Sequence, residues 1–72
     1  MAMLMLEAIG PRGEELAMAA GDARGVAVGW DEEFSTATFD SDDADEAGLQ
    51  ALIFEELDAR EPDWRSHLRV AE

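Results

Sequence analysis

Carboxylates are the side chains of this sequence with the clearest capacity for chemistry, and five of them lie between Asp40 and Glu46 in the run DSDDADE. An apolar helical pattern follows this run, so part of it is explained by a helix entry. The helix dipole favours each carboxylate in a first turn by about 0.3–1 kcal/mol. A solvated helix entry accounts for two or three of these acids, and the rest point to a cation or a basic partner.

Calcium is the first alternative for this run. An EF-hand loop needs oxygen ligands at positions 1, 3 and 5, Gly at position 6 and Glu at position 12. If Asp43 is position 1, Asp45 and Gly48 match, but Ala47 and Phe54 stand at positions 5 and 12. We therefore predict no EF-hand, no dedicated metal site and no cofactor, and an adventitious divalent cation is the alternative.

The residues that serve enzymes as nucleophiles and bases are scarce. His67 is the only His, and the chain has no Cys, Lys or Tyr. Ser35, Ser41 and Ser66 stand in no motif that would activate a hydroxyl. A chain of 72 residues also leaves little room for a substrate cleft. We predict that the protein is not an enzyme and has no catalytic residues.

Net charge is the most informative property of the whole chain. Eighteen Asp and Glu face five Arg and no Lys, which gives a formal net charge of −13. Self-repulsion on this scale destabilises a compact small domain, so it indicates a basic partner, a bound cation or a salty environment. The apolar run 1–9 is too short to span a bilayer, and the absence of Cys suits a reducing compartment. We expect a cytoplasmic protein of a bacterial host, with no membrane partner.

The elements that position these acids form, by prediction, one compact α+β domain over residues 1–72. Alternating apolar residues predict a hairpin of strands 25–30 and 34–39, joined by Asp31–Glu33. The apolar run gives a possible third strand over 2–7, because a lone hairpin is marginal in water. We expect a small antiparallel sheet with helices on one face. The other face, the hairpin loop and the helix entry are left to carry charge.

Two helices are predicted to cover this sheet, with a possible third. Helix 11–20 begins with Pro11 at its first position and stops at Gly21. Helix 43–59 starts at a capping box formed by Asp43 and Glu46 and carries a stripe of Leu49, Leu52, Ile53 and Leu57. Glu56 lies beside this stripe and is expected to meet an Arg or to reach the margin. Residues 63–69 form a short helical turn or an edge strand.

A partner is expected to bind the acids of the hairpin loop, the helix entry and the outer side of the long helix. The first two groups lie at opposite ends of the second hairpin strand, about 20 Å apart at 3.4 Å per residue. A span of this size fits a strip of duplex better than a single metal ion. The predicted partner-binding residues are Asp31, Glu32, Glu33, Asp40, Asp42, Asp43, Asp45, Glu46, Glu55 and Asp58.

In its size, acidity, lack of Cys and compact α+β pattern, the chain resembles the small phage-encoded anti-CRISPR inhibitors that mimic DNA. The resemblance is to a class, because these inhibitors share no common motif. It implies a basic nucleic-acid-binding target, such as the PAM-reading surface of a CRISPR surveillance complex. Inhibition would follow from exclusion of target DNA, with no direct binding to nucleic acid.

Two other classes of function use the same charge. An antitoxin or immunity-type protein would neutralise a basic toxin through the same electrostatics. A halophilic housekeeping domain would use its acids for solubility alone. The oligomeric state is a monomer or a homodimer, and in the dimer Met1, Met3, Met5 and Leu6 would cover the symmetric interface.

Overall fold

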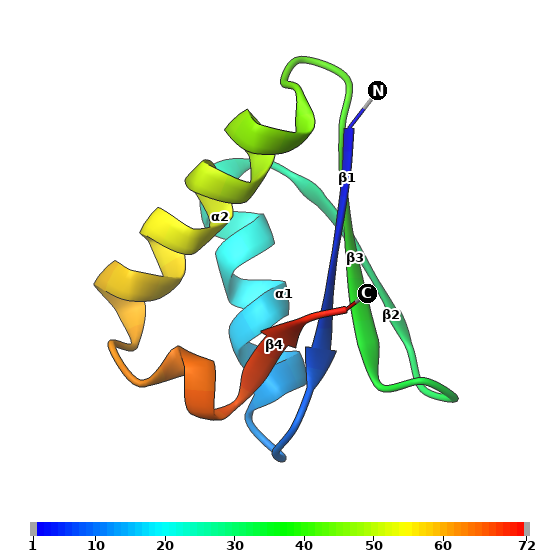
Figure 1. The fold of residues 1–72 in the computed structure, drawn as a ribbon, viewed down its shortest axis with the longest axis vertical. Helices are drawn as coiled ribbons and strands as arrows, with labels where there is room; N and C mark the ends of the chain where they lie inside the picture. The colour runs from blue at the N-terminus through cyan, green and yellow to red at the C-terminus, as the bar shows by residue number, and fades with distance from the viewer. Residues whose placement is uncertain (1, 72) are drawn as a thin grey trace.

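The computed structural model describes residues 2–71, and these form four strands, two α-helices and one short 3-10 turn. Their order along the chain is β1 (Ala2–Ala8), α1 (Gly13–Arg24), β2 (Ala27–Asp31), β3 (Thr36–Ser41), α2 (Glu46–Arg60), η1 (Trp64–Ser66) and β4 (Leu68–Val70) (Figure 1). This βαββαβ order is that of the split βαβ, or ferredoxin-like, topology. The predicted α+β class and the third strand are confirmed.

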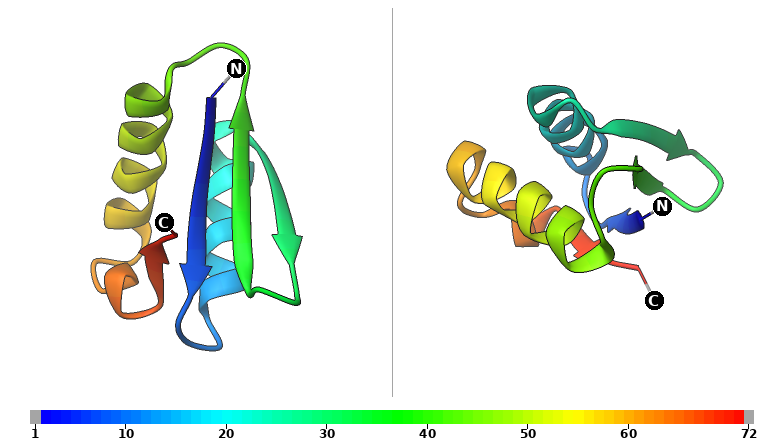
Figure 2. Two further views of the ribbon diagram at one scale, coloured as in Figure 1. Left: turned by 45° about the vertical axis from the view of Figure 1, so that its right-hand side comes forward. Right: turned by 90° about the horizontal axis from the view of Figure 1, so that it is seen from above.

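The sheet has the strand order β2-β3-β1-β4, and all neighbouring strands are antiparallel. Both helices lie on the same face, and the opposite face is uncovered (Figure 2). Side chains alternate between the two faces of a strand. Leu4 and Leu6 of β1 therefore point toward the helices together with their cross-strand neighbours Phe39 and Ala37, and all four are buried.

The helices complete the core from the other side. Leu49, Ile53 and Leu57 of α2 are fully buried, as the predicted apolar stripe requires, whereas Leu52 is only half-buried. Trp64 of η1 closes the end of this core with 1% of its surface exposed. Among the described residues, no buried side-chain nitrogen or oxygen lacks a hydrogen-bond partner.

The uncovered face of the sheet departs from prediction. We call it the open face and define it by the outward residues of the three long strands: Met3, Met5, Glu7, Ala27, Gly29, Asp31, Thr36, Thr38 and Asp40. Charge was expected across it, but its centre carries the methionines, a glycine and Thr38. Acids stand only toward its two ends. Leu6 lies in the core, so the predicted homodimer interface cannot include it, and Met1 lies outside the described residues.

Helix α1 does not stop at Gly21 but continues to Arg24. The helix ends at Gly25, which has φ of 67° and donates its N–H to the Asp22 carbonyl, while Val26 N–H bonds to the Gly21 carbonyl. This is the Schellman arrangement, in which glycine adopts the left-handed conformation. Because it uses residues 25 and 26, β2 begins at Ala27 and not at 25. Gly21 is required for packing instead, since a Cβ there would lie 2.7 Å from Val28 Cγ1.

The N-cap of helix α2 lies two residues later than the predicted N-cap, Asp43. Asp45 is the N-cap and accepts a hydrogen bond from Gly48 N–H at 2.7 Å. Asp43 lies in the preceding loop, where its own N–H donates to Ser41 Oγ. The reason is that β3 extends to Ser41, which leaves too little chain for a helix to start at residue 43. The segment 63–69 forms a 3-10 turn at Trp64–Ser66 followed by the edge strand β4, so both the short helical turn and the edge strand are present, and neither is a third α-helix.

Candidate anionic surface

The acids between residues 31 and 46 form two groups, one at each end of β3. The tip cluster consists of Asp31, Glu32 and Glu33 in the hairpin, and the entry cluster consists of Asp40, Asp42, Asp43, Asp45 and Glu46 before and at the start of α2. The hairpin turn and the loop before α2 lie at opposite ends of the molecule (Figure 1). Six residues of β3 separate them by about 20 Å. The predicted spacing is therefore present, and the two clusters do not merge.

Within the tip cluster, Asp31 has a structural role. Its Oδ1 accepts hydrogen bonds from the backbone N–H of Glu33 at 2.9 Å and of Phe34 at 3.3 Å, which fixes the turn. An Asp side chain bonded to the backbone two residues on is typical of turns. Glu32 and Glu33 are exposed, and within residues 2–71 their carboxylates have no hydrogen bond or ion pair. These two are the free charges of the hairpin.

In the entry cluster, the Asp45 carboxylate is likewise committed to the fold as the α2 N-cap. The other four acids are exposed and have no arginine within ion-pair distance in the described part of the chain. They are Asp40, Asp42, Asp43 and Glu46. Asp40 stands on the open face, between Met3 on β1 and Ala27 on β2. The entry cluster thus joins the uncovered sheet to the start of α2.

The two acids predicted on the outer side of α2 interact within the protein. Asp58 Oδ1 accepts a hydrogen bond of 2.6 Å from the indole Nε1 of Trp64, whose ring is buried. Glu55 lies 3.4 Å from Arg24 of α1. Neither contact could be predicted from helical spacing, because each partner lies outside α2. The anionic surface therefore does not continue as free charge along α2.

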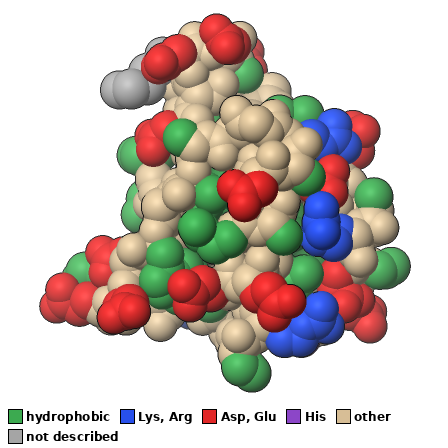
Figure 3. Space-filling model, turned by 180° about the vertical axis from the view of Figure 1, so that it is seen from behind, with side chains coloured by type: hydrophobic (Ala, Val, Ile, Leu, Met, Phe, Trp, Pro, Cys, Tyr) green, Lys and Arg blue, Asp and Glu red, His purple; other side chains and the backbone are tan. Residues whose placement is uncertain are grey.

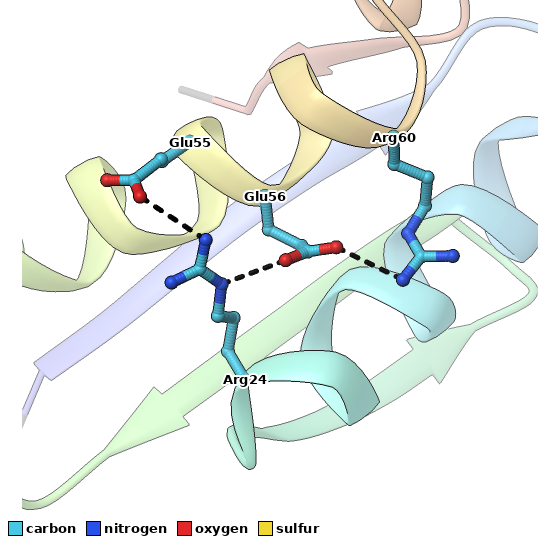
Figure 4. Close-up of polar contacts among 4 residues, drawn as sticks. All are labelled: Arg24, Glu55, Glu56 and Arg60. Atoms are coloured by element: carbon cyan, nitrogen blue, oxygen red, sulfur yellow. Dashed lines mark hydrogen bonds and ion pairs between the residues drawn. The ribbon is translucent and has the colours of Figure 1, made fainter.

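Arginines join the two helices in a network that also contains Glu56. Glu56 receives Nε of Arg24 at 2.9 Å and a guanidinium nitrogen of Arg60 at 3.1 Å (Figure 4). The hydrogen bond from Arg24 is the main cause that holds the pKa of Glu56 below its ordinary value, against the opposing effect of desolvation. The same bond raises the pKa of Arg24. The expectation that Glu56 meets an arginine is confirmed.

All five arginines are engaged. Besides Arg24 and Arg60, Arg12 pairs with Glu61 at 2.9 Å and Arg69 pairs with Glu7 across the sheet. Arg65 stacks over the Trp64 ring, 4.4 Å from its centroid. No arginine occurs between residues 25 and 59. In Figure 3 the arginines in view lie along one side of the molecule with acids beside them, while further acids stand at the loop ends and at the centre of this face.

The charge density approaches that of a nucleic acid. The described residues span 30 × 27 × 20 Å, and the chain has a net charge of −13. Duplex DNA carries one charge per 1.7 Å of axis, which is about 18 charges in the same 30 Å. Averaged over its length, the protein therefore carries a net charge of the same order as a duplex of equal length.

Three features that are typical of other binding sites were sought in the described residues. No three His, Asp or Glu side chains there lie close enough to hold a metal ion. Four-stranded sheets that bind RNA stack bases on aromatic side chains, and the open face has none. No helix in residues 2–71 is long and apolar enough to cross a membrane. Comparison with family models, curated proteins and solved structures finds no match to this chain.

Proposed function

We propose that this protein is an acidic inhibitor that occupies the basic surface of a nucleic-acid-binding protein as a mimic of DNA. One observation carries the proposal: the acids of 31–46 have no cationic partner among the described residues, while every arginine is engaged elsewhere. Unpaired like charges destabilise the fold. A cationic partner would relieve this repulsion on binding.

The free carboxylates would replace phosphates in such a groove. Six of them remain after the acids with structural roles are set aside, two in the tip cluster and four in the entry cluster. Lysines and arginines that neutralise DNA release its condensed counterions, which makes binding strongly salt-dependent. The inhibitor acts by occupancy and needs no chemistry. The more specific target that we propose is the PAM-reading surface of a CRISPR surveillance complex in the bacterial cytoplasm.

The test uses the immobilised protein to capture partners from bacterial cells, with washes of increasing salt. The purified partner is then bound to labelled duplex DNA, and the protein is added as competitor. We expect displacement of the duplex at low salt and progressive loss of competition as salt rises. A captured toxin whose active site does not contact nucleic acid would support the antitoxin class instead.

Two matched variants separate a specific surface from net charge. The first is Asp40→Lys, Asp42→Lys and Asp43→Lys, which leaves the Asp45 cap intact. The second reverses three exposed acids elsewhere: Glu15, Asp22 and Asp63. Each reversal adds two positive units, so both variants carry a net charge of −7. We expect the first to weaken competition at least about 30-fold and the second by no more than about threefold, since 1.4 kcal/mol is tenfold in affinity. Equal loss in both would overturn a specific surface.

The halophilic alternative has its own measurement. If the acids serve only solubility in salt, the chain should fold only when molar salt screens the repulsion. Circular dichroism in dilute buffer and in molar salt distinguishes the halophilic domain from the acidic inhibitor. We expect a folded protein in dilute buffer, because four of the five arginines make contacts that join separate elements or cover the aromatic end of the core.

A further inference from the structure

The centre of the open face is apolar, and neither helix covers it. Met3 and Met5 of β1 are 51% and 40% exposed, although they lie in a central strand. Thr38 lies between Met5 and Gly29 in the same cross-strand row. Methionine is flexible and polarizable, and it is common on surfaces that adapt to a partner. This centre has the composition of a contact surface.

Gly29 is the second, independent observation. A Cβ built at Gly29 meets no atom within 4 Å, and its φ is not in the left-handed region. Neither packing nor backbone conformation within the described residues therefore requires glycine there. Glycine inside a strand weakens it and often marks the close approach of another backbone. The space above Gly29 is thus suited to an element from outside the described fold.

The distribution of charge indicates what kind of element would contact the open face. The tip cluster stands at one end of the open face, and Asp40 with the entry cluster stands at the other. An occupant that contacts the apolar centre must also present cations toward both ends. The faces of a sheet bury helices, whereas its edges take strands. The span of about 20 Å corresponds to about 13 residues of α-helix at 1.5 Å per residue.

We propose that the open face is the docking surface for an amphipathic α-helix of a basic partner. Apolar side chains of this helix pack on Met3, Met5 and the gap above Gly29, and its lysines or arginines reach the two acidic clusters. The inference rests on the proposed function in taking the partner to be basic. A second copy of this chain fits poorly, because its open face would bring the same carboxylates against these.

The probe is a synthetic helical peptide of about 18 residues, with lysines at both ends and an apolar stripe at the i, i+3, i+4, i+7 spacing between them. A scrambled peptide of the same composition has the same charge and no stripe. Binding to the intact protein is measured by fluorescence anisotropy, and the contact surface is mapped by amide chemical shifts. We expect the amphipathic peptide to bind at least about tenfold more tightly than the scrambled one. When the amphipathic peptide is added, the largest changes in amide chemical shift should fall at Met3, Met5, Gly29 and Thr38 of the protein.

Gly29→Val supplies the sharpest variant. It should leave the thermal midpoint unchanged or raised, because valine favours strands and meets nothing at this position. It should lower peptide affinity at least about tenfold by filling the gap. Ala51→Val places the same side chain on an exposed residue of α2 and should leave affinity unchanged. The double variant Met3→Ala and Met5→Ala removes the apolar contact without adding bulk and should also weaken binding.

Failure of this inference is distinct from failure of the proposed function. If Gly29→Val and the Met variant bind the amphipathic peptide as the native protein does, or if the shifts are confined to the loops, the open face is not the docking surface. Competition with duplex DNA by the entry cluster would then still stand. If the second copy were the occupant, sedimentation would report a dimer that Gly29→Val dissociates, and the proposal would be wrong.

Discussion

The hydrogen bond from Trp64 to Asp58 allows a decisive test of whether an acid on α2 serves the fold or a partner. Replacing Asp58 with Ala removes the acceptor of a 2.6 Å bond from an indole that is only 1% exposed. A buried donor left without a partner costs about 1–3 kcal/mol. In a domain of this size, each kcal/mol lowers the thermal midpoint by about 4–8 °C. The expected result is a clear loss of stability.

The assay is thermal unfolding followed by circular dichroism at fixed pH and salt. Asp63→Ala is the matched control. Asp63 is exposed and makes no side-chain cap hydrogen bond, and its replacement removes one negative charge, as Asp58→Ala does. Loss of one negative charge alone should slightly stabilise a chain of net charge −13. Asp58→Asn keeps an oxygen acceptor and should retain most of the stability.

The refuting result is equally concrete. If Asp58→Ala unfolds at the temperature of Asp63→Ala, the bond contributes nothing and Asp58 is free for a partner. If Asp58→Ala keeps its stability but binds the captured partner more weakly, Asp58 belongs to the anionic surface that contacts the partner.

Three further variants test the local structure. Asp45→Ala should lose about 1 kcal/mol of unfolding free energy, because it removes the α2 N-cap, whereas Asp43→Ala should change it by less than about 0.5 kcal/mol; chemical denaturation measures both. Glu56→Gln should destabilise at neutral pH. The hydrogen bond from Arg24 lowers the pKa of Glu56 in the folded state. The stability that ionised Glu56 contributes is therefore present above the ordinary pKa of 4.5 and is lost as pH falls through the folded pKa. The difference in unfolding free energy between Glu56→Gln and the native protein should disappear in acid. Gly21→Ala should cost about 1–3 kcal/mol by overpacking, and an unchanged melting curve would contradict the close approach described for α1.

Local patterns in the sequence predicted most of the fold. Alternation of apolar residues located the hairpin, and 3.6-residue spacing located α2, because both periods follow directly from backbone geometry. The boundaries were less well predicted. Gly21 and Gly25 are the same residue type, and only the packing of Val28 and the left-handed φ of Gly25 distinguish a close contact from a helix end.

The distribution of charge was harder to predict, because it depends on pairs that are distant in the sequence. Arg12 meets Glu61 across 49 positions, and Arg69 meets Glu7 across 62. No local signal reports such pairs. The acids of 31–46 could be located by composition, since the stretch 25–59 contains no arginine, but composition did not show that Glu55 meets Arg24. The apolar centre of the open face was predicted only in part: Met3 and Met5 were grouped with Leu6, because the run MLML gives no indication of which alternate residues remain exposed.

The separation of arginines from the acids of 31–46 also has a kinetic consequence. Because no arginine lies between residues 25 and 59, the tip and entry clusters carry free anions with no cation at ion-pair distance in the described residues. The field of these clusters attracts a cationic target before contact. Electrostatic complementarity of this kind acts mainly on the association rate, which falls with ionic strength far more than the dissociation rate changes. The absence of arginine from residues 25–59 thus favours encounters in which these clusters meet the target first.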